Sequence, residues 1–445
     1  MIIRDYQQRL IDETRAAIAA GHRRVLVVVP TGGGKTVVAS EMIRSAVGRA
    51  KRVLFLAHRE ELLRQSVDKL AACGVDDVRV IRAGSVLGNH DAPVTVASIG
   101  TLCRPRWACV CPPADVVVVD EAHHAVASTW RTILDRYPHA VIVGLTATPQ
   151  RADGTPLGDA FQSMVIGPTV AELVARGHLV TCRVFAPDRQ LEAGEVAQSP
   201  ADAYALHGNG ERAIVFCANV EHARRVAAEF TVPTEVITGE TRDRSAMLAR
   251  FASGETRVIV NVYVLTEGFD DPSVGVCILA RNPAHDGTYL QMVGRVLRPS
   301  PGKTHATLID LCGSVHAHGL PDEPRTYTLD GEGIRASNRE ALKQCTTCGA
   351  CYRTAPVCPE CGVVAAAAPA SLPDVIGAAI GAITQREARP MPFLAMTSKF
   401  TSRCTACGGS VRIGDAILWR KGEKPHHARC GKAASVEELT RWVTG

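Results

Sequence analysis

The sequence predicts an α/β protein with two tandem domains, each built on a parallel sheet, followed by small cysteine-rich modules. From about residue 25 to residue 320, short apolar runs alternate with helical stretches, which is typical of βαβ units. A stretch without a strong strand, residues 185–210, divides this series into two halves of similar size. After about residue 325 the alternation stops and paired cysteines begin.

Each half contains several apolar runs of strand length. The run DVVVVD at residues 115–120 shows no polar alternation, which is typical of a strand covered on both faces of a parallel sheet. In the first half we expect strands at VLVVVP, RVLFLA, VTVAS, DVVVVD and AVIVGLTA, and in the second half at RAIVFCA, TEVIT, RVIVNV and GVCILA.

The length and the N-terminal sequence indicate the broad class of protein. A chain of 445 residues exceeds a single core and suggests roughly two or three domains. The N-terminal stretch MIIRDYQQRLIDE is charged from its fourth residue, so we expect no signal peptide and a cytoplasmic protein. An apolar stretch at residues 363–383 is predicted to be a linker and not a membrane span, because Pro369, Pro373 and Asp374 interrupt it.

The net charge of +5 resides in the cysteine-rich tail. Residues 345–445 contain 12 Lys and Arg against 7 Asp and Glu, and the rest of the chain is balanced at 38 against 38. Eight of the 16 cysteines lie in the same tail, mostly as CxxC pairs, which indicates metal binding in a chain without a secretion signal. Two zinc ions held by seven thiolates and one histidine would add 4 − 7 = −3 and lower the tail to about +2. Nucleic-acid contacts are therefore expected from placed side chains and not from bulk charge.

Residues 30–36, PTGGGKT, follow an expected strand and open an expected helix. In this arrangement glycines let backbone N–H groups wrap a phosphate, and the helix N-terminus adds its partial positive charge. The general P-loop pattern has glycine six residues before the lysine, where this chain has Val29; a glycine-rich turn without a ligand is the alternative. The residues expected to bind ATP and Mg²⁺ are Thr31, Gly32, Gly33, Gly34, Lys35, which reaches the β- and γ-phosphates, and Thr36, which holds the metal.

Two acids and two histidines follow the run of valines. Asp120 ends the strand, where a second acid is needed to hold Mg²⁺ beside the phosphates. Glu121 is expected to orient or deprotonate the attacking water. A zinc site built from Asp120, His123 and His124 is the alternative, although the HExxH spacing is absent from the sequence. The phosphate interpretation explains both motifs together.

With these motifs the chain resembles the superfamily 2 helicases and translocases, in their DEAH-containing group, and its wording is closest to that of DNA restriction and repair motors. The resemblance covers residues 1 to about 320 and implies two RecA-like domains with ATP and Mg²⁺ between them. Its motifs, in family order, are RDYQQ (4–8), PTGGGKT (30–36), FLAHREELLRQ (55–65), TVASIGTL (95–102), DEAH (120–123), GLTATP (144–149), IVFCANVEHA (214–223), VLTEGFDDP (264–272) and QMVGRVLRP (291–299).

The resemblance implies roles for several side chains of the first domain. Gln7, with Arg4 nearby, would read adenine. Thr146 and Thr148 resemble the motif that couples hydrolysis to domain movement, with His123 as its partner.

In the second domain, the resemblance points to two further motifs. Gly268 and Asp270 resemble nucleotide contacts, and Arg295 and Arg298, in the QxxGRxxR pattern that starts at Gln291, resemble arginine fingers facing the γ-phosphate. Guanidinium groups stabilise charge on the transferring phosphoryl, and supplying them from the opposite domain makes hydrolysis depend on closure. A solvated basic turn is the alternative.

Polar residues in several motifs are expected to face a nucleic-acid strand, as they do in relatives. Hydroxyls, amides and a few basic groups contact phosphates without reading bases, which suits a motor that moves along any sequence. Each of them is individually also a common loop or capping residue. The candidates are His58, Arg59, Ser98, Thr101, Asn219 and His222.

The tail contains two candidate zinc sites. Cys345, Cys348, Cys358 and Cys361 have CxxC–x9–CxxC spacing, which suits one tetrahedral Zn²⁺, and Cys351 is a fifth cysteine expected to stand aside. The second candidate consists of Cys404, Cys407, His427 and Cys430, with His426 as a substitute ligand, and loosely resembles small treble-clef or PARP-like fingers.

Two roles are open for these modules. They would either stabilise segments too small to bury a core, or bind single-stranded nucleic acid and nucleic-acid junctions. The side chains available for gripping are Arg403, Arg412, Arg420, Lys421, Lys424, Phe400 and Trp419.

The expected function is ATP-dependent movement along DNA, or unwinding of it; the alternatives are an ATP-gated nucleic-acid-binding or remodelling factor and an RNA helicase. The expected partners are single-stranded or junction DNA and a separate nuclease or repair protein, because the sequence contains no nuclease motif. The expected segments are two RecA-like domains (1–182 and 183–325), a linker (326–344), a zinc ribbon (345–362), an Ala/Pro-rich linker (363–398), a second zinc finger (399–432) and a tail (433–445).

Overall fold

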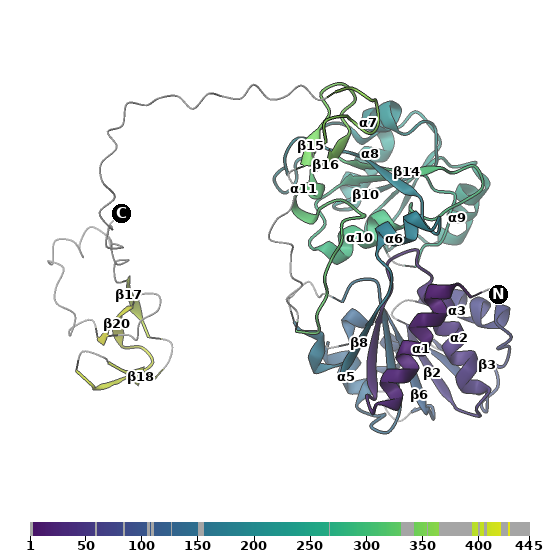
Figure 1. Ribbon diagram of the computed structural model, residues 1–445, viewed down its shortest axis with the longest axis vertical. Coiled ribbons are helices and arrows are strands. Elements are labelled where there is room, and N and C mark those ends of the chain that lie inside the picture. The colour runs from purple at the N-terminus through teal and green to yellow at the C-terminus, as the bar shows by residue number, and fades with distance from the viewer. Residues whose placement is uncertain are drawn as a thin grey trace. The chain divides into compact units, whose positions relative to one another are not determined.

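The computed structural model contains two compact units, residues 1–366 and 367–445 (Figure 1). It describes residues 3–57, 60–82, 85–104, 107, 111–125, 127–149, 155–266, 268–330, 342–353, 355–364, 394–398, 401–404, 407–419 and 426–427. Within these ranges, a helix with the length and apolarity needed to span a bilayer is not found. Most of the expected linker at 363–398 lies outside the described residues.

The first domain is built on an eight-stranded sheet in the order β4-β3-β5-β2-β6-β7-β1-β8, parallel except for the β3–β4 pair. Its strands are β1 (Arg24–Val28), β2 (Val53–Ala57), β3 (Val78–Arg82), β4 (Ser85–Leu87), β5 (Val94–Ser98), β6 (Val116–Asp120), β7 (Val141–Thr146) and β8 (Ser163–Ile166). Its α-helices are α1 (Asp5–Ala19), α2 (Lys35–Val47), α3 (Glu60–Ala72), α4 (Ile99–Leu102), α5 (Ser128–Leu134) and α6 (Val170–Ala175).

Helices cover both faces of this sheet, which is why its strands are apolar without alternation. Leu10, Ile43 and Leu70 place α1, α2 and α3 in one core cluster, and Trp130 places α5 in the other, with Leu26 of β1. The predicted run of valines is β6, buried in its middle three residues.

The second domain is built on a six-stranded, fully parallel sheet in the order β11-β12-β10-β13-β14-β9. Its strands are β9 (Thr181–Phe185), β10 (Ala213–Cys217), β11 (Thr234–Ile237), β12 (Val258–Asn261), β13 (Val276–Ala280) and β14 (His305–Asp310). Its helices are α7 (Pro200–His207), α8 (Val220–Glu229), α9 (Arg244–Ser253), α10 (Asp286–Gly294) and α11 (Ser314–His318). The predicted fold class, two tandem RecA-like domains, is therefore confirmed.

Within the two α/β domains, five strands are missing from the sequence-based expectation, namely β3, β4, β8, β9 and β14. Edge strands β4 and β9 keep polar or exposed positions, so they lack the continuous apolar run that identified the central strands. Strand β9 also crosses the expected boundary at 182/183, and its pairing with β14 places the start of the second sheet at Thr181.

The segment that follows the second domain returns to the first. Tyr327 and Leu329 pack against the core cluster of α5, and the carbonyl of Leu329 accepts a hydrogen bond from the Gly158 N–H at 2.8 Å. Part of the segment expected as a linker, 326–344, is therefore packed. Residues 331–341 of it lie outside the described part.

The two cysteine modules belong to different units. The first module, residues 345–362, continues the hairpin of β15 (Leu342–Gln344) and β16 (Cys351–Arg353) and belongs to the first unit. The second unit contains short antiparallel strands: β17 (Leu394–Thr397), β18 (Ser402–Arg403), β19 (Ser410–Val411), β20 (Ala416–Trp419) and β21 (His426–His427).

Candidate active site

The predicted phosphate-binding loop, residues 30–36, joins β1 to α2. Its last glycine, Gly34, has φ 84°, a backbone conformation that favours glycine, and a Cβ there would also meet the end of the Gln7 side chain. Helix α2 starts at Lys35 directly after this turn, so its free N–H groups and positive dipole end face the loop.

Helix α1 is fastened to this loop from behind. The Tyr6 hydroxyl donates to the carbonyl of Gly33 at 2.8 Å, and the Gln7 Nε2 atom lies 3.5 Å from the same oxygen. The Gln7 Oε1 atom accepts from the Arg4 N–H at 3.0 Å. Gln7 is buried, and neither Gln7 nor Arg4 lines the cavity in front of Lys35, so their role in reading adenine stays a prediction.

Glu121 lies at the centre of the polar contacts in the cleft. Its Oε1 atom is 2.6 Å from the Lys35 Nζ atom, and its Oε2 atom is 3.5 Å from both the His123 Nδ1 atom and the Gln291 Nε2 atom. Its backbone has φ 48°, and its N–H donates to the Asp120 carboxylate at 3.0 Å. A strained backbone is typical of functional sites, and here it turns a buried carboxylate toward the phosphate loop.

The DEAH sequence is linked to the neighbouring strand through His123. Its Nδ1 atom lies 3.1 Å from the Thr146 hydroxyl, which in turn donates to the Thr148 carbonyl at 2.8 Å. These three residues are buried. The expected contact between His123 and the threonine motif therefore exists, and it connects Glu121 to the loop that leaves the first sheet.

The second domain supplies the other wall of a cavity of about 250 Å³. Arg295 donates to the carbonyls of Thr266 and Phe269, with Nη distances of 2.7 Å to each. Arg298 donates to the Phe269 carbonyl at 3.1 Å and forms an ion pair with Asp270. Both arginines therefore hold the 264–272 loop. The cavity is lined by Thr31, Gly32, Gly34, Lys35, Thr36, Asp120, Glu121, Gly268, Asp270, Arg295, Arg298 and neighbouring residues.

The charges of this cavity fit a triphosphate. Burial lowers the pKa of Arg298 to about 10, yet the group remains a cation at neutral pH. Its buried Nε atom has no hydrogen-bond partner among the described residues, so it is a donor that an anionic ligand would satisfy. Lys35 and the N-terminus of α2 add positive charge from the opposite wall.

Lys69 is a member of the cavity that the sequence did not reveal. Its Nζ atom lies 3.1 Å from the Asp270 carboxylate, which joins α3 of the first domain to the loop of the second. Burial, followed by repulsion from Arg298, lowers the pKa of Lys69. In sequence it reads as one more charged residue on an amphipathic helix, and its partner is 201 positions away.

Asn219, one of the nucleic-acid candidates, caps a helix, and His222, another candidate, supplies the backbone N–H group that is capped. The Asn219 Oδ1 atom accepts from the His222 N–H at 2.8 Å and so caps helix α8. Burial lowers the pKa of His222. Asn219 remains exposed at the carboxyl edge of the sheet, so a further contact through its amide is compatible with the cap.

Two of the other candidates are less accessible than expected. Ser98 and Thr101 are only 5% and 2% exposed, because the short helix α4 turns them into the domain, so the structure does not present them to a strand. His58 and Arg59 lie outside the described residues.

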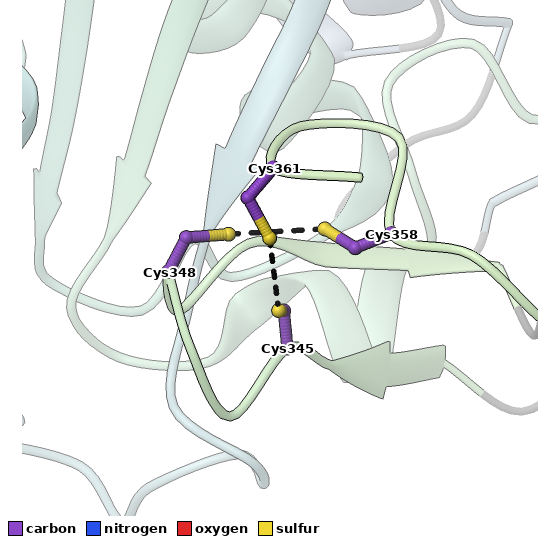
Figure 2. A group of neighbouring side chains, drawn as sticks. All are labelled: Cys345, Cys348, Cys358 and Cys361. Carbon is purple, nitrogen blue, oxygen red and sulfur yellow. Dashed lines mark hydrogen bonds between the residues drawn. The ribbon is translucent and has the colours of Figure 1, made fainter. Parts of the chain in front are cut away.

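The first cysteine module brings four sulfur atoms together (Figure 2). The Sγ atoms of Cys345 and Cys361 are 3.6 Å apart, and those of Cys348 and Cys358 are 3.8 Å apart. Tetrahedral Zn²⁺ with bonds of about 2.3 Å requires sulfur separations of about 3.8 Å, so the four cysteines fit the ion. Backbone N–H groups of Cys348 and Thr347 lower the pKa of Cys345 to about 6, which favours the thiolate. The buried Cys351 packs into the domain core and stands aside, as expected.

The second module brings together three of its expected ligands, Cys404, Cys407 and His427. The His427 Nδ1 atom lies 3.5 Å from the Cys407 sulfur, and its Nε2 atom lies 3.1 Å from the Ser410 carbonyl. A ring that donates through Nε2 leaves Nδ1 free of its proton and able to bind a metal. Cys430 and the His426 side chain lie outside the described part of the chain.

Both α/β domains of the chain are similar to domains of known proteins. Residues 1–151 match the family model for the res subunit of type III restriction enzymes, and residues 199–300 match the helicase conserved C-terminal domain. A 51.5 kDa protein of a Lactococcus phage (isolate 7-9) is 29% identical over 368 residues, covering 76% of this chain and 77% of its own. The chain is a superfamily 2 helicase of the restriction and repair type.

A second sequence relative and one solved structure are also similar to the chain. IRC3 of Saccharomyces cerevisiae, described as a candidate ATP-dependent helicase, is 28% identical over 358 residues, covering 70% of this chain and 52% of its own. The structure of a fragment of a candidate HsdR subunit of a Vibrio vulnificus type I restriction enzyme has a TM-score of 0.58, with 23% identity and coverage of 75% and 70%. The helicase spans about half of the yeast protein and shares the HsdR fold. Its domains and relatives place it among ATP-hydrolysing helicases and translocases.

Replacing Lys69 tests the ion pair between the domains. Lys69→Ala should raise the KM for ATP about 1.4- to 5-fold, because a partly exposed pair contributes about 0.2–1 kcal/mol to closure of the cavity. Lys69→Arg should keep the KM near the wild-type value. The matched control is Lys51→Ala, which removes a surface pair with Asp115 away from the cavity. Equal KM values for Lys69→Ala and Lys51→Ala would contradict the assignment.

Proposed function

We propose that this helicase is an ATP-driven motor that translocates along DNA, with strand separation following from that movement. The observation that carries the proposal is the cavity shared by the two domains, in which Lys35 and Glu121 of the first face Arg295 and Arg298 of the second. A nucleotide bound there would draw the walls together, because its phosphate charge interacts with both.

The side chains of the cavity suggest how hydrolysis is controlled. ATP supplies the γ-phosphate, and Mg²⁺ held by Thr36 and Asp120 would offset its charge. Lys35 would exchange its ion pair with Glu121 for the phosphate oxygens. Glu121, still positioned by His123 and Gln291, would then accept a proton from the attacking water. Because Gln291 belongs to the second domain, the base is fully positioned only when the domains meet.

DNA is the track we favour. The family model of the first domain and the HsdR fragment both belong to restriction enzymes. An RNA track is the rival, and an ATP-gated clamp without translocation is a second; the experiment below separates them. A separate nuclease or repair protein remains a proposed partner.

We also propose that each cysteine module holds one Zn²⁺. Cys345, Cys348, Cys358 and Cys361 would bind the first ion, supported by sulfur separations that suit a tetrahedral ion. Cys404, Cys407, His427 and Cys430 would bind the second. Metal charge balanced by thiolates would leave the tail only mildly basic.

Steady-state ATP hydrolysis with and without polynucleotide tests the motor. We expect stimulation by DNA, and a decrease of about 100-fold or more in turnover for Glu121→Gln, because an amide cannot accept the proton. Binding of a fluorescent ATP analogue to Glu121→Gln is the control, and it should show that the variant still binds nucleotide. Stimulation by RNA alone would favour the RNA track, and nucleotide binding without hydrolysis under any condition would favour the clamp.

Metal analysis tests the zinc sites. Purified protein should contain about two zinc ions per chain, measured by inductively coupled plasma mass spectrometry. Cys358→Ser and Cys407→Ser should each remove about one ion, whereas Cys351→Ser should keep both because that thiol faces the domain core. Zinc loss in Cys351→Ser would show that the ligand set is wrong.

A further inference from the structure

We propose that the first cysteine module forms a metal-dependent edge of the second motor domain, so that metal bound at this module stabilises strand β9 and the core behind it. The proposal rests on the zinc site proposed above and goes beyond it, because the metal would then control the motor itself. It favours one of the two roles that the sequence left open for this module.

Strand β9 lies at the edge of the six-stranded sheet, paired on one side with β14. Its other side meets the module: Phe185 forms an antiparallel bridge with Ala350. The Gln344 Nε2 atom donates to the Ala186 carbonyl, just after the strand, at 2.7 Å. The module therefore covers polar backbone groups that an edge strand would otherwise expose.

The metal ligands share a core with the strand. Cys345 and Cys358 are buried in one apolar cluster with Ala350 and Tyr352, and Phe185 of β9 packs against it. On the domain side, Cys351 joins the cluster that includes Val184 of β9 and Met292 and Val293 of α10. Helix α10 carries Gln291, so this core connects the module to the helix that contacts Glu121.

An ion pair joins the second CxxC pair, Cys358 and Cys361, to strand β9. The Arg183 Nε atom lies 2.8 Å from the Glu360 carboxylate, and Glu360 lies between Cys358 and Cys361 in the sequence CPEC. Arg353, at the end of β16, approaches Asp322 at 3.6 Å. The turn that positions Glu360 depends on the two cysteines on either side of it.

The module is too small to keep this shape without its metal. Its own cluster contains four buried residues, two of which are the ligands Cys345 and Cys358. In modules of this size, binding energy of the metal is folding energy. Loss of the ion should therefore release Glu360, Gln344 and Ala350 from β9 and expose the edge of the motor domain.

Thermal unfolding and hydrogen exchange of the full chain test the proposal. The Cys361→Ser substitution and chelator treatment of the wild type should each lower the melting temperature of the full chain by about 5 °C or more. Both should also speed amide exchange in residues 181–186 relative to the untreated wild type. Cys407→Ser, which empties the second module, is the matched control and should change neither value. Unchanged melting and exchange after measured zinc loss from the first module would overturn the proposal.

A second variant covers the case in which Cys361→Ser does not fold. Gln344→Ala combined with Arg183→Ala leaves the four cysteines intact and should keep the zinc while still speeding exchange in residues 181–186. Exchange at the wild-type rate would overturn the docking. Protein that never contains zinc at the first module would refute the zinc site itself, and the metal analysis makes that outcome distinct.

A second inference rests on a different observation, at the carboxyl edge of the same sheet. We infer that Tyr263 and Arg281 form a platform on which an unpaired nucleobase stacks, a contact that rests on the proposed nucleic-acid motor. Tyr263 lies two residues beyond β12, and Arg281 directly follows β13. Since β12 and β13 flank β10, the pair lies across the end of β10, close to Asn219.

Neighbouring residues hold the exposed Tyr263 ring in place. Tyr263 is 48% exposed, and the Arg281 Cζ atom lies 3.8 Å from its ring centroid, in cation–π geometry. Its backbone has φ 58°, a costly conformation for tyrosine. The buried Asn261 supports the turn, because its Nδ2 atom donates to the Val215 carbonyl at 2.9 Å and its Oδ1 atom accepts from the Leu265 N–H at 3.2 Å. Aromatic rings beside guanidinium groups bind unpaired bases of any sequence.

Binding of a fluorescent single-stranded oligonucleotide tests the platform. Tyr263→Ala should raise the Kd about 5- to 100-fold, as expected for one lost base stack, whereas Tyr263→Phe and Tyr263→Trp should bind nearly as wild type. Leu206→Ala removes another exposed apolar side chain, on α7, and should leave the Kd unchanged. A wild-type Kd for Tyr263→Ala would overturn the platform, and so would equal loss in Tyr263→Phe. Absence of binding by the wild type would instead refute the proposed motor.

Discussion

The contact between Lys35 and Glu121 organises the cleft of this helicase. It joins the start of α2 to the end of β6, two elements that the parallel sheet places side by side at its carboxyl edge. The same carboxylate approaches Gln291 of the second domain, so one acidic side chain senses both the phosphate loop and the position of the neighbouring domain. The buried setting makes these interactions stronger than they would be in water, and leaves Glu121 few alternatives to them.

On the cleft side of the second domain, several cationic side chains contact the loop formed by residues 264–272. Arg295 and Arg298 bind its carbonyls from within the domain, and Lys69 reaches its Asp270 from the other side of the cleft. The loop therefore occupies the place where nucleotide charge would be felt by both domains. Toward the other edge of the same sheet, the first cysteine module contacts β9, so the second domain is bounded by a charged loop on one side and the first cysteine module on the other.

Sequence reasoning was most successful where the signal is local. The phosphate loop is a run of seven residues in which Gly32 and Gly34 have the positive φ that favours glycine, and the central strands are continuous apolar runs because helices cover both faces. It was less successful for the nucleic-acid candidates. Ser98 and Thr101 belong to a matching motif, but the turn into α4 buries them, and burial depends on neighbours that a motif does not contain.

By itself, the sequence determined the two-domain α/β class, the phosphate-loop motif and the spacing of the paired cysteines, because each of these depends on residues close together in the chain. Only the tertiary structure decided which distant residues meet. Lys69 finds Asp270 across 201 positions, Arg281 finds Tyr263 through the order of strands in a sheet, and the first cysteine module covers β9 instead of extending from a linker. Such contacts arise when strands and helices pack, and the pattern of any one segment carries no record of its partner.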